Sequence, residues 1–264
     1  MRAATKLALG LGAALLAGAA SATPVATSGS FDGPGQTLQD YLQGPWAAPG
    51  TTIPANFVNT NQYSPDEIWT IGSTGTSAVT FVFELTANSG NNTFGIYDIA
   101  DPSQRLTIYN SATAAPGQRA VLAESFSTPG KFSTYLADSD GLPIGAATSV
   151  TWGSSNFGLF MVAGGTTFFS QAILNANGAD QLVAYQGSGQ NMTWPFLGGS
   201  SRPWLANEIL LAWEDLNTYR GGGDRDYNDM VILMESIKSV PVPAPLALLA
   251  AGALGIGWAR RRRA

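Results

Sequence analysis

Short runs of β-type residues, separated by turn residues, make up most of this 264-residue chain. Each run is rich in Val, Ile, Phe, Tyr and Thr, and clusters of Gly, Asn, Asp, Ser and Pro separate it from the next, which is typical of an all-β domain. The runs that we expect to form strands are 68–72, 78–86, 93–98, 105–109, 119–124, 131–137, 148–152, 157–162, 166–169, 181–185, 208–215 and 229–237. The best helical candidate is a single turn at 38–42, which Thr37 is placed to cap.

The run 78–86 predicts how these strands pack. Every second residue from Val79 to Leu85 is apolar, and the residues between them are mixed, so one face suits a core and the other suits a surface. We therefore predict an antiparallel β-sandwich that is jelly-roll-like. Full closure into a barrel is the alternative. Residues 92–97 (NTFGIY) and 155–160 (SNFGLF) resemble each other, through equivalent strands in two sheets or by chance.

The chain contains no cysteine and no histidine. Without them there is no Ser-His-Asp triad, no imidazole base, no usual zinc site and no disulfide framework. Stability must come from the hydrophobic core, with a metal ion as a further source, and any catalysis would rest on carboxylates, hydroxyls, lysine or tyrosine.

The first 22 residues have the three parts of a secretory signal peptide. Arg2 and Lys6 provide the positive start, 7–19 is apolar, and Ala20-Ser21-Ala22 is a small-x-small cleavage site. We expect the mature protein to begin near Thr23, which leaves a β-sandwich domain at 23–239.

The other end, residues 240–264, also has three parts. The sequence VPVPAP at 240–245 precedes an apolar stretch at 246–259, and four arginines follow at 260–263. A helix over 246–259 would be roughly 21 Å long at about 1.5 Å per residue, shorter than a hydrocarbon core of roughly 30 Å. The arginines would stay cytoplasmic, with the body on the far side of the membrane.

This tail resembles the PEP-CTERM class of sorting signals, in its VPLPA-like variant. The resemblance implies a short membrane helix that anchors the protein transiently in the inner membrane of a Gram-negative bacterium until an exosortase-type peptidase processes it. It also implies a link to exopolysaccharide. Val-Pro-Val-Pro-Ala lacks the Glu of the PEP form, so the resemblance leaves the processing enzyme open.

Removal of both ends leaves an acidic body. Arg2, Lys6 and the four tail arginines are lost with the two ends. The body keeps 7 basic residues and all 18 acidic ones, a net charge of −11. Such a body repels phosphate backbones and attracts divalent cations. We therefore expect no nucleic-acid partner.

The densest polar cluster lies between Trp213 and Glu235. Its metal-ligand candidates are Glu214, Asp215, Asp224, Asp226, Asn228 and Asp229. Crowded carboxylates repel one another unless a proton or a cation neutralises them, and Asp224, Asp226 and Asn228 have the alternate spacing of a calcium loop. Three glycines at 221–223 permit a sharp turn before them. A solvated acidic turn is the competing interpretation.

An EF-hand does not fit this loop, although Glu235 stands at its twelfth position. The sixth position, which needs Gly, is Asp229, and the run after it is β-type. An extended chain would place Glu235 roughly 20 Å from Asp229 at about 3.3 Å per residue. We expect 208–213 and 230–234 to pair as antiparallel strands instead, which would bring Glu214 and Asp215 beside Asp229.

The body is similar to domain-of-unknown-function family 4114. The resemblance rests on the sequences NTFGIYD (92–98), FGLF (157–160), LN (174–175), VAYQG (183–187), WEDL (213–216) and GDRDYND (223–229). It spans about 38–237 and implies a β-sandwich with a calcium site and no established enzymatic activity. It also implies His in many relatives where this chain has Gln181.

These features together predict a secreted, non-enzymatic, calcium-binding protein of the cell surface or extracellular matrix. The resemblance of the tail implies a role in the exopolysaccharide or biofilm layer. One alternative is a carbohydrate-binding module that uses Trp152, Trp194 and Trp204, although core packing is the more usual role of Trp. Another is a glycoside hydrolase that uses Glu84 and Glu124. The sequence DSDG at 138–141 could add a cation ligand, but it is more typical of a turn after a strand.

Overall fold

The computed structural model describes residues 19–20, 37–84, 92–110, 115–216 and 225–243. The chain divides into two compact units, 21–241 and the two end segments 1–20 and 242–264. In the unit made by the ends, β1 (Ala19–Ala20) pairs antiparallel with β17 (Val242–Pro243). The rest of the expected signal peptide and the expected tail helix lie outside the described residues. No helix in the described ranges has the length and apolarity needed to cross a membrane.

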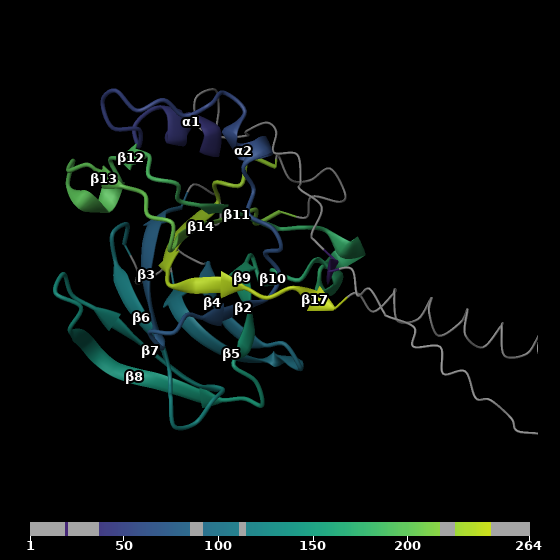
Figure 1. Cartoon of the computed structure of the whole chain (residues 1–264). Helices are drawn as coiled ribbons and strands as arrows, with labels where there is room; N and C mark the ends of the chain where they lie inside the picture. Colours follow the sequence, from purple (N-terminus) through teal and green to yellow (C-terminus); the bar gives the residue numbers. More distant parts are fainter. Residues whose placement is uncertain (1–18, 21–36, 85–91, 111–114, 217–224, 244–264) are drawn as a thin grey trace, which may run out of the picture. The chain divides into compact units, whose positions relative to one another are not determined.

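The unit 21–241 is built on two antiparallel sheets, as the strand pattern predicts (Figure 1). The six-stranded sheet has the order β16 (Ile237–Ser239), β2 (Trp69–Ile71), β9 (Asn156–Ala163), β4 (Thr93–Asp98), β5 (Asp101–Asn110), with β10 (Thr166–Phe169) also paired to β9. The seven-stranded sheet has the order β11 (Leu182–Gln186), β14 (Glu208–Trp213), β15 (Met230–Glu235), β3 (Thr76–Phe83), β6 (Arg119–Glu124), β7 (Lys131–Ala137), β8 (Pro143–Thr151).

One hydrophobic core lies between the two sheets. Phe94, Leu159 and Trp69 of the six-stranded sheet belong to the same buried cluster as Phe81 and Ile232 of the seven-stranded sheet. Burial of both inner faces is what holds a two-layer sandwich together. The described strands show no pairing between the sheets, so they do not close into one barrel. The all-β, antiparallel architecture is confirmed. Strands β6, β7 and β8 follow one another as a meander, and the jelly-roll likeness of the whole stays a prediction.

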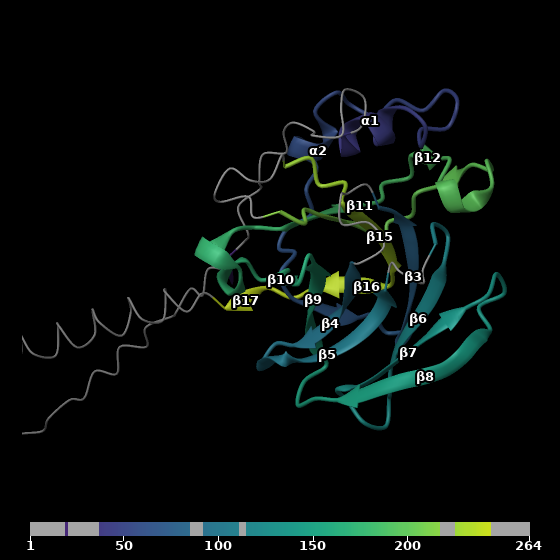
Figure 2. The same cartoon turned by 180° about the vertical axis from the view of Figure 1, so that it is seen from behind.

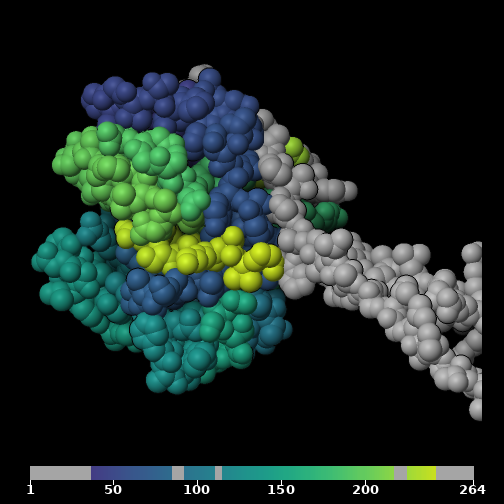
Figure 3. Space-filling view, in the orientation of Figure 1, coloured from purple at the N-terminus to yellow at the C-terminus, as the bar shows by residue number. Residues whose placement is uncertain are grey.

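A cap covers the outer face of the seven-stranded sheet over β11, β14 and β15 (Figures 1 and 2). It consists of α1 (Leu38–Gln43), α2 (Phe57–Thr60), the ribbon β12 (Asn191–Met192) with β13 (Arg202–Pro203), and η3 (Pro195–Leu197). Trp46, Trp194 and Trp204 pack there against Leu210 and Leu233 of the sheet. In the space-filling view the N-terminal (purple) and green segments of the cap form one continuous layer (Figure 3).

Because the cap lies on one side and the sandwich core on the other, strands β14 and β15 are buried on both faces. All six residues of β14 are buried, and so are the first five of β15. The expectation of one core face and one surface face, made for 78–86, is corrected at the end of β3, where Val82 lies under the cap. The unbroken apolar runs in 209–213 and 230–234 are the sequence signal for two-sided burial.

Two local predictions are confirmed. Thr37 caps α1 through a capping box, in which its hydroxyl accepts from the Asp40 amide and the Asp40 carboxylate accepts from the Thr37 amide. Asp138 organises the turn between β7 and β8, because its carboxylate accepts from the amides of Asp140 and Leu142. Gly141 has a φ of 81°, which glycine adopts without strain. The short 3₁₀ helices η1 (Ala172–Leu174) and η2 (Ala176–Gly178) lie between β10 and β11.

Candidate metal centre

The β14–β15 hairpin places the acidic residues at one end of the seven-stranded sheet. The two strands are antiparallel, with Trp213 opposite Met230 and Glu208 opposite Glu235. Glu214 and Asp215 follow directly after Trp213, and Asp229 comes directly before Met230. The predicted pairing is therefore confirmed, and it brings the three carboxylates together at the base of the loop.

Glu214, Asp215 and Asp229 each offer a carboxylate oxygen, and these oxygens lie within 4.8 Å of one another. All three residues are buried. The Asp229 carboxylate accepts a 2.7 Å hydrogen bond from the Asp215 amide. The Glu214 carboxylate accepts from the amides of Leu216 at 3.2 Å and Arg225 at 2.9 Å. Backbone donors from both sides of the loop thus orient the acids before any ion binds.

Asp226 and Asn228 are buried in the same segment of the loop. The residues that flank them, Arg225 and Tyr227, have left-handed backbones with φ of 60° and 52°. A non-glycine residue in this region is unusual and marks a tightly determined loop. The Asp226 carboxylate accepts from the Asn228 amide at 3.2 Å. Asp224 and the glycines at 221–223 lie outside the described residues.

Burial and mutual repulsion govern the charge of this cluster. Desolvation, followed by the negative charges of Glu214 and Asp215, raises the pKa of Asp229 from 3.8 to about 10. A carboxylate in such surroundings favours a bound proton or a cation. The cluster is therefore not a solvated acidic turn, since its acids are removed from water.

Gln181 lies directly beside the cluster. Its side-chain amide donates to the backbone carbonyls of Glu214 at 3.0 Å and Leu216 at 2.6 Å, and its backbone carbonyl accepts from the Glu214 backbone amide at 3.1 Å. The sequence singled out this position only through the family resemblance. Gln181 holds the backbone that carries Glu214 and so positions the acids.

Tyr227 fixes the other side of the loop. Its buried hydroxyl donates to the carbonyl of Asp180 at 2.9 Å, which ties the loop to the residue before Gln181. Asp180 and Asp66 are a second pair of interacting acids, which the sequence did not predict. Isolated Asp residues near strand starts read as turn residues, so the sequence carries no signal for this pair.

The donor set defines which ions the cluster could hold. Carboxylate and amide oxygens suit hard cations such as calcium and magnesium, and the chain has no thiol or imidazole for softer metals. Glu235 is not a neighbour of the cluster, because it pairs with Glu208 at the opposite end of the strands. The structure therefore agrees with the rejection of an EF-hand.

The structure does not bring together the residues of the two other candidate sites, the tryptophan sugar-binding surface and the glycosidase pair. Trp152, Trp194 and Trp204 are buried at 7%, 0% and 0% exposure, so they form core and not a sugar-binding surface. Thr76 pairs with Ala123, which places Glu124 near the start of β3, whereas Glu84 follows its end. Eight residues of strand separate them by roughly 26 Å at about 3.3 Å per residue, too far for a glycosidase pair.

The fold and the site together define an antiparallel β-sandwich with a buried acidic cluster at the end of a central hairpin. Residues 147–236 match the model of a family described as "Domain of unknown function (DUF4114)". The match covers Gln181 and the whole acidic segment, and it is narrower than the expected span of about 38–237. No curated protein and no solved structure matches the chain.

Proposed function

We propose that this protein is a secreted, non-enzymatic β-sandwich whose β14–β15 hairpin binds calcium. One observation carries the proposal: three buried carboxylates whose oxygens lie within 4.8 Å of one another. Calcium takes roughly six to eight oxygens at about 2.3 to 2.6 Å. Glu214, Asp215, Asp226, Asn228 and Asp229 supply the described part of that set, Asp224 is a further candidate, and loop carbonyls or water complete it.

Calcium is favoured over magnesium by the kind of ligands available. Magnesium demands near-ideal octahedral geometry and keeps several of its waters, whereas calcium accepts a larger and less regular set of protein oxygens. A buried cluster of carboxylate and amide oxygens suits the ion that takes more protein ligands and keeps fewer of its waters. Extracellular calcium modules bind at roughly 0.1 to 1 mM, so the ion would act as a structural element in a calcium-rich exterior.

The direct test measures calcium binding and thermal unfolding of the full chain. Calorimetry should give a heat with calcium and a smaller one with magnesium. The melting temperature should rise with calcium and fall with chelator, since an ion that binds only the folded state stabilises it by about 2.7 kcal/mol at a hundredfold excess over Kd and by about half that at tenfold.

Two variants and a control locate the ion. Asp226→Ala should abolish the calcium response. Asp229→Asn keeps an acceptor for the Asp215 amide but removes an acid whose pKa the cluster raises, so it should melt above the wild type in chelator and fail to gain stability in calcium. Asp140→Asn changes an exposed turn acid and should respond to calcium like the wild type. Identical wild-type melting curves in calcium and chelator, with no binding heat, would refute the calcium site.

The proposed location follows from the two ends of the chain. The signal-like segment 1–22 would direct export, and the PEP-CTERM-like tail 240–264 would anchor the protein in the membrane until an exosortase-type peptidase cleaves it. The mature protein would then lie at the cell surface or in the exopolysaccharide matrix of a Gram-negative bacterium. Mass spectrometry of the native protein should find neither end, and an intact soluble chain ending at Ala264 would contradict this route.

A further inference from the structure

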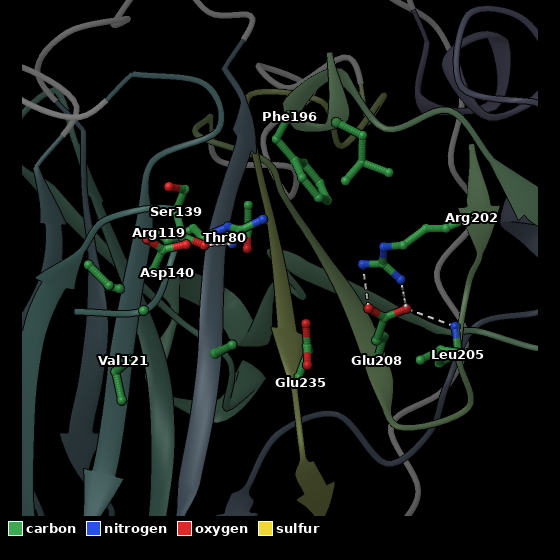
Figure 4. Close-up of a pocket in the computed structure, with 15 residues that line it drawn as sticks. Thr80, Arg119, Val121, Ser139, Asp140, Phe196, Arg202, Leu205, Glu208 and Glu235 are labelled. Atoms are coloured by element: carbon green, nitrogen blue, oxygen red, sulfur yellow. Dashed lines mark hydrogen bonds and ion pairs between the residues drawn. The ribbon is translucent and has the colours of Figure 1, made fainter. Parts of the chain in front are cut away.

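A cleft of about 450 Å³ lies on the outer face of the seven-stranded sheet, beside the cap (Figure 4). Its floor includes Thr80 of β3, Arg119 of β6 and Glu235 of β15. The cap segment 196–205 forms one wall and the β7–β8 turn at 139–141 forms the other. The acidic cluster lies at the opposite end of β14 and β15, so this cleft is a separate feature of the molecule.

Arg202 and Glu208 form a rigid polar pair in this cleft. The guanidinium contacts both carboxylate oxygens, at 2.6 and 2.8 Å, and the Leu205 amide donates to the same carboxylate at 2.7 Å. Glu208 is only 1% exposed, so the pair is fixed in place. Bidentate pairs of this kind hold their geometry well, which leaves the other guanidinium edge in a defined orientation.

Glu235 stands on the floor directly opposite Glu208 in the strand register. Figure 4 shows it between Arg119 on one side and the Arg202–Glu208 pair on the other. Within the described residues, its half-buried carboxylate makes no hydrogen bond and no ion pair. Desolvation and the charge of Glu208 raise the pKa of Glu235, and the positive charges of Arg202 and Arg119 offset part of that rise.

Phe196 supplies an apolar surface above these groups. Its ring stacks on the buried Trp194 with an interplanar angle of 8° and a centroid distance of 6.1 Å. The side chain is partly exposed and borders the cleft. A buried ring beneath it fixes the orientation of the face that it offers to a ligand.

The charges that line the cleft restrict its ligand. Arginine only donates hydrogen bonds and an ionised carboxylate only accepts them, and here the two kinds alternate. An anion would be repelled by Glu235 and Asp140, and a cation would be repelled by Arg119 and Arg202. A neutral group that both donates and accepts satisfies every one of them, and the hydroxyl is one such group.

We propose that this cleft binds an uncharged, hydroxyl-rich saccharide, with a sugar ring on Phe196 and its hydroxyls between Glu235 and the two arginines. The volume suits a small-molecule site, for which about 300 to 1,000 Å³ is usual. The ligand class agrees with an exopolysaccharide environment, and saccharide binding in this cleft requires neither the calcium site nor the proposed route of export. The proposal also differs from the tryptophan-based module expected from the sequence, since the stacking residue is Phe196.

The test is calorimetry on the full chain in calcium, with neutral gluco-, galacto-, manno- and xylo-oligosaccharides as probes. A sulfated oligosaccharide and a chitosan oligomer serve as anionic and cationic comparisons. We expect at least one neutral probe to bind with a Kd of about 1 mM, so that binding is nearly complete at a probe concentration of about 10 mM. That probe should bind more tightly than either charged probe.

Variants assign the binding to the cleft. Phe196→Ala and Glu235→Ala should each weaken it by roughly tenfold or more, and Glu235→Gln should recover part of the loss because it keeps an acceptor. Phe126→Ala, which removes an aromatic ring that is 79% exposed outside the cleft, should leave affinity unchanged. Circular dichroism melting checks that each variant is folded.

Three outcomes would overturn the proposal: no neutral probe binds the folded wild type, a charged probe binds more tightly than all neutral ones, or both folded alanine variants bind like the wild type. A normal calcium response alongside any of these results would leave the calcium proposal standing. Loss of the calcium response with intact saccharide binding would refute only the calcium site.

Discussion

At the scale of single residues, buried acids are the most unusual feature of this molecule. Asp66, Glu214, Asp215, Asp226 and Asp229 are each less than 9% exposed. A buried charge is costly unless it is paired or coordinates a metal. Four of these five acids lie in the segment that the sequence assigned to calcium, so their burial agrees with the proposed site.

The pair of Asp66 and Asp180 leads to a pH prediction. Burial raises the pKa of Asp180 from 3.8 to about 7, and burial together with the charge of Asp180 raises that of Asp66. The folded state therefore holds more protons than the unfolded state between about pH 4 and pH 7, so the free energy of unfolding falls as pH rises through this window. Above it the loss is complete.

Asp180→Asn should remove the part of this loss that belongs to Asp180. The variant should match the wild type near pH 4 and exceed its free energy of unfolding by roughly 1 to 3 kcal/mol at pH 8, since the two acids share the titration. Urea unfolding in saturating calcium at both pH values measures the difference. Asp140→Asn is the exposed control, and a constant gap between Asp180→Asn and the wild type at all pH values would count against the assignment.

At the scale of elements, the sequence predicted the strands better than the layers. Strands β4, β6, β7 and β10 have the predicted bounds, because alternation and turn residues are local signals. The cap was missed, since Trp46, Trp194 and Trp204 meet only through long-range contacts. The acidic base of the hairpin was predictable because an antiparallel pair dictates which residues face each other across its end.

The cleft, unlike the acidic base of the hairpin, could not be predicted from the sequence. Glu208, Glu235, Arg202 and Phe196 come from separate elements, and none has a neighbour in sequence that suggests a site. Their proximity depends on strand register and on where the cap ends. Neither the register nor the end of the cap is encoded in a short motif, so no local pattern in the sequence indicates the cleft.

The repeated Phe-Gly pattern has a packing explanation at this scale. Strands β4 and β9 are neighbours in one sheet, not equivalents in two, with Tyr97 opposite Gly158 and Gly95 opposite Phe160. A Cβ at Gly158 would overlap the ring of Tyr97, and one at Gly95 would overlap the carbonyl of Leu106 and the ring of Phe160. Each glycine makes room for an aromatic ring on the adjacent strand.

Gly158→Ala should therefore destabilise the fold through steric overlap. Tyr97 cannot move away easily, because its hydroxyl donates to Gln171 at 2.9 Å and its ring packs edge-on against Phe169. We expect a loss of about 1 to 3 kcal/mol in the free energy of unfolding, measured in urea.

Gly153→Ala is the matched control for this substitution. No atom lies within 4 Å of a Cβ at that position, and its backbone is not left-handed. The control should be neutral or stabilising by up to about 1 kcal/mol, since alanine reduces the entropy of the unfolded chain. Equal effects of the two substitutions would mean that the Tyr97 contact does not limit the packing of these strands.

At the scale of the whole molecule, the elements of the two sheets and of the cap all lie in one part of the chain. Both sheets, the cap and the acidic hairpin lie within 37–239. The strand β16 ends at Ser239, and the Val240 amide donates to the Ile68 carbonyl, so the folded unit extends slightly past the boundary at 239 that the sequence predicts. Contacts group 21–241 as one compact unit.

We therefore expect a chain limited to 23–241 to fold without either end. The two-sheet core buries large side chains such as Trp69, Trp213 and Phe157 completely, and that burial supplies the main stabilising free energy without disulfides. The shortened chain should show a β-type circular dichroism spectrum and one cooperative thermal transition in calcium. Its melting temperature should fall in chelator, because the uncompensated acids of the hairpin then oppose folding. A shortened chain that stays unfolded in calcium, while the full chain folds under the same conditions, would show that the ends contribute to the fold and would contradict the one-domain boundary.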